Sequence, residues 1–313
     1  MFQCFPKLSA FWKMVGMKFL VTGGAGFIGS HLVRRLSARG PVTVLDDFSS
    51  GKRENLAGQP CSVLSGSILD PAPLAEACAG ATHVFHLAAL VSVPESVSHP
   101  ARCQEINVEG TRRVLAAAAQ AGAKRLVLAS SCAVYGDEPT MPKTESSPVS
   151  PACPYAESKL AGEKLCAEAK LPAVALRFFN VYGPRQDPRG PYAAAVPKFL
   201  EAARAGSPLT IFGDGHQTRD FVYVDDVTAA LEHAALSPSL SGVYNVASGR
   251  SVSILRLAEL VLALTGLRSE IRHAPARPGD ILHSSASIEK LRATGWQPSF
   301  DLAAGLQKIL SAT

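Results

Sequence analysis

A tyrosine and a lysine four residues apart mark the stretch PYAESKLAGEKL near the middle of the chain. If this stretch is helical, Tyr155 and Lys159 point to the same side, one turn apart. A free tyrosine titrates near pKa 10, so a phenol acts as a base near neutral pH only when that pKa falls by about three pH units. A lysine ammonium one turn away favours this fall, and Ser130 and Ser131 in SSCAVYGD add hydroxyls. The same spacing also occurs on ordinary helix surfaces, so other residues have to decide.

A second motif, TGGAGFIG, has the form of a dinucleotide-binding turn. Gly23, Gly26 and Gly29 follow the apolar run KFLV and open a helical pattern that ends at Gly40. Such glycines allow a tight turn and a close approach of the backbone to a pyrophosphate at the helix N-terminus. The motif therefore predicts a nucleotide cofactor.

An acidic residue at the end of the second predicted strand, Asp46, indicates which cofactor binds. Asp46 follows Gly29 by seventeen residues, near the spacing expected for an acid that binds the ribose hydroxyls. A carboxylate there repels a 2′-phosphate and favours NAD, although Lys52 and Arg53 nearby leave NADP as the alternative.

Composition excludes several function classes. The chain of 313 residues is 47% hydrophobic and 18% charged, with a net charge of +5 and no basic run, so nucleic acid is a poor partner. The seven cysteines form no C-x-x-C pair, which predicts reduced thiols and a cytoplasmic protein. No metal site is expected, since His83 and His86 face opposite sides of a predicted strand. No apolar run is long enough to span a membrane.

Strand-length apolar runs alternate with helical patterns, which predicts an α/β fold. We expect a Rossmann-type doubly wound parallel sheet with a smaller C-terminal α/β substrate-binding lobe. Strands are predicted near 18–22, 42–48, 61–65, 81–89, 124–131 and 171–183, with helices at 27–39, 74–80, 100–122 and from 155. The predicted organisation is a disordered leader (1–16), an NAD domain (17–178), and a mainly substrate-binding lobe (179–313), parts of which return to the first domain. Met17 is the expected start of the folded part.

With these motifs in place, the chain resembles the extended short-chain dehydrogenases/reductases, and more narrowly the UDP-hexose 4-epimerases that act on UDP-N-acetylglucosamine. The resemblance runs from about Met17 to Thr313. It rests on TGGAGFIGSH, HLAALVSVPESV, NVEGT, SSCAVYGD, PYAESK, RFFNVYGPRQDPRGPYAAAVP, TRDFVYVDD and RPGD.

The resemblance implies a catalytic set and two binding sites. Tyr155, Lys159 and Ser131 would be catalytic: Tyr155 takes the proton of the sugar 4-hydroxyl, and a transient 4-keto sugar forms and is reduced again. The implied NAD site comprises Gly23, Gly26, Phe27, Ile28, Gly29, Asp46, Asp47, Ser50, Gly51, Ser67, Ile68, Leu87, Ala88, Ala89, Asn107, Tyr155 and Lys159. The implied UDP-sugar site comprises Ser92, Ser131, Cys132, Tyr155, Asn180, Gln186, Tyr192, Arg219, Arg277, Asp280 and Ser284.

Departures from the family's patterns bear on the substrate. Cys132 and Ala133 stand where the 4,6-dehydratases carry an Asp–Glu pair, so dehydration is not expected. Ser284 is small where epimerases confined to UDP-glucose carry Tyr, which favours an N-acetylated sugar. Val91 adds bulk beside the sugar and argues against exclusive specificity. Ser67 replaces the Asp that usually binds adenine.

Two alternatives stay open at this stage. Enzymes that act on UDP-glucuronate, either 4-epimerases or decarboxylases, share the scaffold, and Arg185 suits a carboxylate. However, Asn180 stands where the glucuronate epimerases typically carry Thr. The other alternative is a catalytically silent NAD-binding regulator, although such relatives usually lack the Tyr or the Lys. The family also implies a homodimer formed by the helix from Pro100 and the helix that begins near Tyr155.

Overall fold

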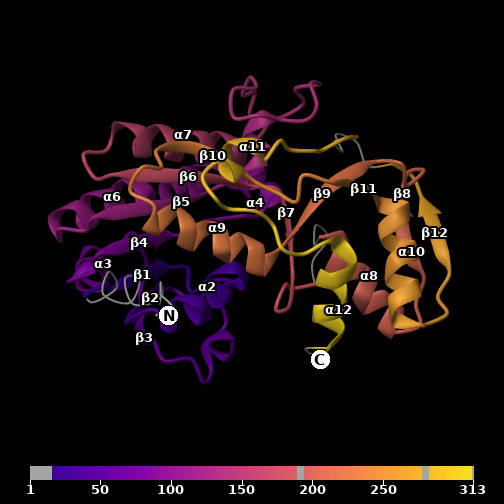
Figure 1. Cartoon of the computed structure of the whole chain (residues 1–313), viewed down its shortest axis with the longest axis horizontal. Helices are drawn as coiled ribbons and strands as arrows, with labels where there is room; N and C mark the ends of the chain where they lie inside the picture. Colours follow the sequence, from indigo (N-terminus) through magenta and orange to yellow (C-terminus); the bar gives the residue numbers. More distant parts are fainter. Residues whose placement is uncertain (1–15, 189–193, 277–281, 312–313) are drawn as a thin grey trace, which may run out of the picture.

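A seven-stranded parallel sheet forms the centre of the computed structural model, which describes residues 16–188, 194–276 and 282–311 (Figure 1). The strand order is β3-β2-β1-β4-β5-β6-β10, and each neighbouring pair is parallel. The strands are β1 (Phe19–Thr22), β2 (Val42–Asp46), β3 (Ser62–Ser65), β4 (His83–His86), β5 (Arg125–Ser131), β6 (Ala173–Phe178) and β10 (Gly242–Val246). This order confirms the predicted doubly wound class.

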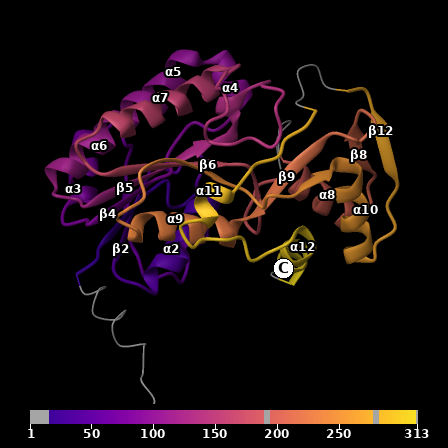
Figure 2. The ribbon, with the colours of Figure 1, turned by 45° about the horizontal axis from the view of Figure 1, so that its top comes forward.

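Helices cover both faces because successive strand residues point to opposite sides. Phe19 and Val21 of β1 pack on one side, with α2 and α9, whereas Leu20 packs on the other, with α3 and α6 (Figure 2). The first layer comprises α2 (Phe27–Ser37), α9 (Val224–Leu236) and the short α11 (Glu289–Arg292). The second comprises α3 (Pro71–Cys78), α5 (Pro100–Gln104), α6 (Gly110–Gln120) and α7 (Pro154–Glu168), with α4 (Val93–Ser98) at one end.

The helix predicted over 100–122 is three consecutive segments. A π-helical turn (η2, Glu105–Glu109) lies between α5 and α6 and contains the buried Asn107. The sequence analysis did not predict α4, although Ser92 at its N-cap, Pro94 in its first turn and Glu95 three residues after Ser92 are helix-start signals. Two short 3₁₀ segments, η1 (Arg53–Leu56) and η3 (Cys132–Tyr135), follow β2 and β5.

The run predicted as one strand over 171–183 is two strands in different sheets. β6 ends at Phe178, and β7 (Asn180–Tyr182) pairs instead with β9 (Thr218–Tyr223), which also pairs with β11 (Ser251–Ser253). Phe179, between the two strands, donates its backbone N–H to Val246 at the end of β10. The chain therefore crosses from the large sheet into the smaller lobe at this residue.

The smaller lobe has its own apolar core and more helix than the sequence indicated. Phe199, Leu209, Ile211, Leu257 and Leu306 are buried together in it. Its remaining elements are α8 (Ala195–Arg204), β8 (Leu209–Phe212), α10 (Ile254–Thr265), β12 (Ile271–Ala274) and α12 (Leu302–Ser311). They lie past one end of the strands of the large sheet, to the right in Figure 1.

Candidate active site

A cavity of about 800 Å³ lies at the carboxyl ends of the parallel strands, where the strand order reverses between β1 and β4. This is the usual ligand position in doubly wound sheets. Residues from both predicted sites line it: Gly23, Gly26, Phe27, Ile28, Gly29, Asp46, Asp47, Ser50, Ser67, Ile68, Leu87, Ala88, Ala89, Ser92, Ser131, Tyr155, Lys159 and Gln186. The fold therefore brings together segments from β1 to β7.

Two residues predicted to bind the cofactor, Gly51 and Asn107, do not line the cavity but contact residues that do. A Cβ on Gly51 would lie 2.9 Å from Asp46 Oδ1, so Gly51 allows the chain to pass against that carboxylate. Asn107 accepts a hydrogen bond from Leu90 N (2.7 Å) and donates to Leu90 O (2.9 Å) and Ser158 Oγ (2.9 Å). Asn107 thus holds the loop after β4 against the Tyr155 helix.

The glycine turn is shaped by contacts that exclude a side chain. Gly23 has φ +70°, and a Cβ on it would lie 2.7 Å from Ala88 N. A Cβ on Gly29 would lie 2.1 Å from Gly23 O. Because α2 begins at Phe27, its N-terminal N–H groups face the cavity beside this turn. The turn therefore offers backbone donors to a pyrophosphate.

Asp46 is buried where the ribose acid is expected. Its carboxylate accepts hydrogen bonds from Ala25 N (2.8 Å) and Phe48 N (2.9 Å). Burial raises the pKa of Asp46, and these two N–H groups oppose the rise. A carboxylate has about four acceptor positions, so two remain for ribose hydroxyls.

The two nearby cations that left NADP open both have partners. Lys52 Nζ lies 3.6 Å from Asp187 Oδ2, and Arg53 stacks 4.0 Å above the ring of Phe48. Ser67 Oγ accepts from Leu69 N (3.1 Å), so its hydroxyl proton remains available as a donor. The glycine turn, the carboxylate and this hydroxyl fit NAD.

Tyr155 and Lys159 meet in the cavity from successive turns of α7. Lys159 Nζ lies 5.7 Å from the centre of the Tyr155 ring and donates to Ala129 O (2.9 Å) on β5. Ser131, at the end of β5, accepts from Ala133 N (3.1 Å), and its side chain lowers the pKa of Tyr155. The three residues predicted to be catalytic are therefore neighbours.

In the chain without NAD, the pKa of Tyr155 lies above its ordinary value, so the expected low pKa stays a prediction for the NAD-bound protein. Burial raises the pKa of Tyr155 to about 12, because the phenolate loses more from desolvation than Ser131 returns. Burial also lowers the pKa of Lys159 to about 8. Phenolate chemistry near neutral pH thus requires a further positive charge in the cavity.

Two polar side chains face the part of the cavity expected to hold the sugar. Gln186 donates from Nε2 to Val181 O (3.1 Å), while its buried Oε1 has no hydrogen-bond partner among the described residues. A buried acceptor without a partner is costly, so a ligand hydroxyl fits there. Ser92 caps α4 by accepting from Glu95 N (3.3 Å).

Four other residues predicted to bind the sugar nucleotide do not line the cavity, namely Asn180, Cys132, Arg219 and Ser284. Asn180 donates to Asp220 O (3.1 Å), Arg219 donates to Thr218 O (2.9 Å), and Ser284 N donates to Thr218 O (3.1 Å). Cys132 is close enough to Arg219 and Asp220 for their charges to affect its thiol, whose pKa burial raises to about 12. These four residues thus gather around the start of β9. Tyr192, Arg277 and Asp280 lie outside the described residues.

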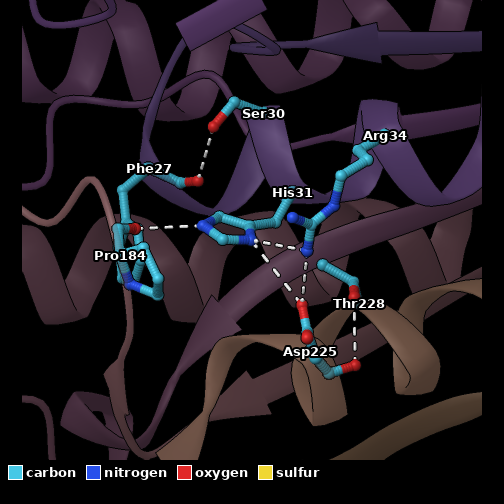
Figure 3. A network of polar contacts seen from close by, with 7 residues as sticks. All are labelled: Phe27, Ser30, His31, Arg34, Pro184, Asp225 and Thr228. Carbon is cyan, nitrogen blue, oxygen red and sulfur yellow. Dashed lines mark hydrogen bonds and ion pairs between the residues drawn. The ribbon is translucent and has the colours of Figure 1, made fainter. Parts of the chain in front are cut away.

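A polar network attaches the loop that carries Gln186 to the cofactor helix. His31 Nε2 on α2 donates to Pro184 O (3.0 Å), and Arg34 on the same helix donates to Asp225 Oδ1 (3.0 Å) on α9 (Figure 3). Arg185, next in the chain, lines a separate cavity together with His31 and Arg34. Among the described residues, Arg185 is therefore not part of the lining of the sugar cavity.

Sequence reasoning missed the α5 side of the cavity. This side is lined by Arg102, Glu105 and Ile106. Glu95 Oε1 on α4 lies 3.7 Å from Arg102 Nη1. The i, i+3, i+4 spacing of the first three residues was the available signal, because such residues share a helix face.

Comparisons with known proteins agree with this geometry. Residues 19–247 match the NAD-dependent epimerase/dehydratase family. The chain belongs to this family. A UDP-glucose 4-epimerase of Mycolicibacterium smegmatis is 41% identical over 307 residues, which cover 94% of this chain and 97% of that one. A UDP-N-acetyl-alpha-D-glucosaminuronate decarboxylase of Bacillus cytotoxicus is 39% identical over 270 residues (82% and 83% covered).

The fold comparison points the same way. A UDP-N-acetylglucosamine 4-epimerase of Methanobrevibacter ruminantium M1, solved with UDP-N-acetylmuramic acid, superimposes with a TM-score of 0.90 at 39% identity. The alignment covers 94% of this chain and 97% of that chain. The predicted family, the enzyme class and NAD as cofactor are confirmed.

Three further observations concern the described residues alone. No helix among them is both long and apolar enough to cross a bilayer. No group of three or more His, Cys, Asp or Glu side chains within 16–188, 194–276 and 282–311 is arranged to hold a metal ion. The six cysteines in these ranges are free thiols.

Proposed function

We propose that this protein interconverts the C4 epimers of a UDP-hexose, with UDP-N-acetylglucosamine and UDP-N-acetylgalactosamine as the favoured pair and UDP-glucose and UDP-galactose also accepted. The proposal rests on one observation: Tyr155, Lys159 and Ser131 line the same cavity as the glycine turn and Asp46. The names of two relatives, a UDP-glucose and a UDP-N-acetylglucosamine 4-epimerase, support it.

Each residue of the cavity has a separate role in the proposed reaction. The phenol of Tyr155 moves the proton of the sugar 4-hydroxyl, Ser131 donates a hydrogen bond to the same oxygen, and the ammonium of Lys159 favours the phenolate. When bound, NAD supplies the reversible hydrogen acceptor for C4 and adds positive charge beside Tyr155. Gly23, Gly29 and Asp46 would hold NAD in place, and Gln186 would orient the sugar through its free Oε1.

The N-acetylated sugar is favoured by the small side chain of Ser284. We also infer that Arg219 binds the diphosphate, because guanidinium groups form charge-assisted bonds to phosphate. Decarboxylation of a UDP-uronate is the second candidate, since one relative carries that name. The position of Arg185 outside the sugar cavity favours the neutral hexose.

Proton NMR of the anomeric region tests the proposal. Purified protein with added NAD is incubated separately with UDP-N-acetylglucosamine, UDP-glucose and UDP-glucuronate. We expect the 4-epimer of the first to appear fastest. Release of CO2 with formation of a pentose from UDP-glucuronate would support the decarboxylase. No conversion of any of the three with NAD bound would contradict the proposed function.

Ser284→Tyr should narrow the substrate range. The backbone of Ser284 is fixed to Thr218, beside Arg219, so an added ring would extend from a fixed point in this part of the lobe. We expect kcat/KM for UDP-N-acetylglucosamine to fall about tenfold or more, with a change of less than about threefold for UDP-glucose. Equal losses for both sugars in the same NMR assay would show that Ser284 does not contact the acetamide.

We also infer that the protein is a cytoplasmic homodimer. Free cysteines suit a reducing compartment. On α6, Ala116 and Ala119 are exposed, and small residues of this kind allow helices from two copies to pack closely.

A further inference from the structure

A buried glutamate continues the spacing of the catalytic pair. Tyr155, Lys159 and Glu163 follow one another at intervals of four on α7, so all three point to the same side of the helix. Glu163 is 6% exposed and does not line the cavity. It therefore lies behind Lys159, where substrate does not reach.

The carboxylate of Glu163 is held by two neighbouring strands. Ser130 Oγ on β5 donates to Glu163 Oε1 (2.5 Å). Arg177 on β6 donates to both oxygens, from Nε to Oε1 (2.9 Å) and from Nη2 to Oε2 (2.7 Å). Arg177 is in turn fixed 4.7 Å above the ring of Tyr135, whose hydroxyl donates to Asn245 Oδ1 (2.7 Å). These bonds fix the carboxylate as an immobile negative charge.

Glu163 provides the negative charge near the ammonium of Lys159. His86 on β4 is neutral, since burial lowers its pKa to about 3, and it bonds to Thr22 and Thr111. Burial disfavours the ammonium of Lys159, whereas the Cys103 thiol on α5 and Glu163 raise the pKa of Lys159. The guanidinium of Arg177 carries the opposite charge to Glu163 and is paired with both oxygens of its carboxylate.

We propose that Glu163 is a positioning residue for catalysis, whose buried carboxylate keeps Lys159 charged and anchors Ser130, and through it Ser131, at the end of β5. This inference rests on the proposed function of Tyr155, Lys159 and Ser131. Without the carboxylate, the desolvated ammonium would lose its proton at lower pH, and the phenolate of Tyr155 would lose the charge that stabilises it.

The test is the pH dependence of Glu163→Gln. Two unit charges about 6 Å apart interact strongly enough to shift a pKa by one to two pH units at the effective dielectric constant of a protein. We expect the alkaline limb of kcat to move to lower pH by about one unit, with KM for the sugar changed less than about threefold. Glu168→Gln, which removes the same charge from an exposed position on α7, is the matched control and should leave the profile unchanged.

A second variant guards against misfolding, because Glu163→Gln leaves Arg177 without its partner. Glu163→Gln/Arg177→Met removes both charges and should shift the limb in the same direction by less. A limb that coincides with wild type in a folded variant would overturn the proposal. The ultraviolet absorbance of tyrosinate in the NAD-bound proteins, taken as the difference from each protein's NAD-bound Tyr155→Phe counterpart, reports the pKa of Tyr155 without turnover. A rise in that pKa in Glu163→Gln would support the role of Glu163 even if the wild type fails to epimerise any sugar.

Discussion

Tyr155→Phe is expected to lower kcat by about a thousandfold and to leave folding intact. The substitution removes the phenol oxygen that we assign to proton transfer, and a positioned acid or base contributes about 10² to 10⁴ in rate. The ring and the helix should remain, because Tyr155 is tied to α4 through its backbone N–H, which donates to Ser96 Oγ (3.2 Å). Initial rates by NMR and the thermal melting temperature measure the two effects separately.

Tyr135→Phe is the matched control for this prediction. Tyr135 is fully buried, and its hydroxyl donates to Asn245 Oδ1 (2.7 Å) away from the cavity. Its loss leaves a buried acceptor with one partner fewer, which should lower the free energy of unfolding by about 1–3 kcal/mol. Activity per folded molecule should stay near wild type. A Tyr155→Phe protein within tenfold of wild-type kcat would exclude Tyr155 as the proton carrier.

The large sheet and its cofactor edge could be predicted because local patterns determine them. Buried parallel strands appear in the sequence as apolar runs, and Gly23 directly follows β1 while Asp46 is the last residue of β2. The carboxyl ends of such strands meet at one edge, so residues distant in sequence could be assigned to a single site.

The smaller lobe could not be predicted in the same way, because its strands depend on distant partners. β7 is three residues long and pairs with β9 some forty residues later, while Phe179 marks the change of sheet through a bond to Val246. No local pattern distinguishes this from one continuous strand. The separation of Arg185 from the sugar cavity likewise depends on tertiary contacts, among them the bond from His31 to Pro184.

Helix spacing alone does not predict the direction in which the pKa of Tyr155 shifts in the chain without NAD. Spacing on a helix indicates which charges lie near each other, but it says nothing about how much water each group loses. Burial raises the pKa of Tyr155 and lowers that of Lys159. Both shifts disfavour the pair of a phenolate and an ammonium until a cation enters the cavity.

Gly29→Ala should destabilise the protein and prevent NAD binding. The added Cβ would lie 2.1 Å from Gly23 O and 2.8 Å from Gly24 Cα, both backbone atoms that cannot rotate away. Helix α2 would have to move off the turn, at a cost of at least about 2 kcal/mol in the free energy of unfolding. Such a shift would also displace the N-terminal N–H groups of α2 from the pyrophosphate position, so NAD affinity should fall about a hundredfold or more.

Gly26→Ala in the same turn separates crowding from the mere loss of a glycine. Its Cβ would lie 3.3 Å from Gly23 O, and its φ of −73° suits any residue, so the melting temperature should stay within a few degrees of wild type. Melting temperature and NAD titration by calorimetry on all three proteins decide the matter. If Gly29→Ala has the melting temperature and the NAD affinity of wild type, the close packing of α2 on Gly23 does not determine the conformation of the glycine turn. Because Tyr155 lies on α7 and not on α2, a Gly29→Ala protein that lacks NAD but shows the tyrosinate titration of NAD-free wild type would assign the defect to the turn alone.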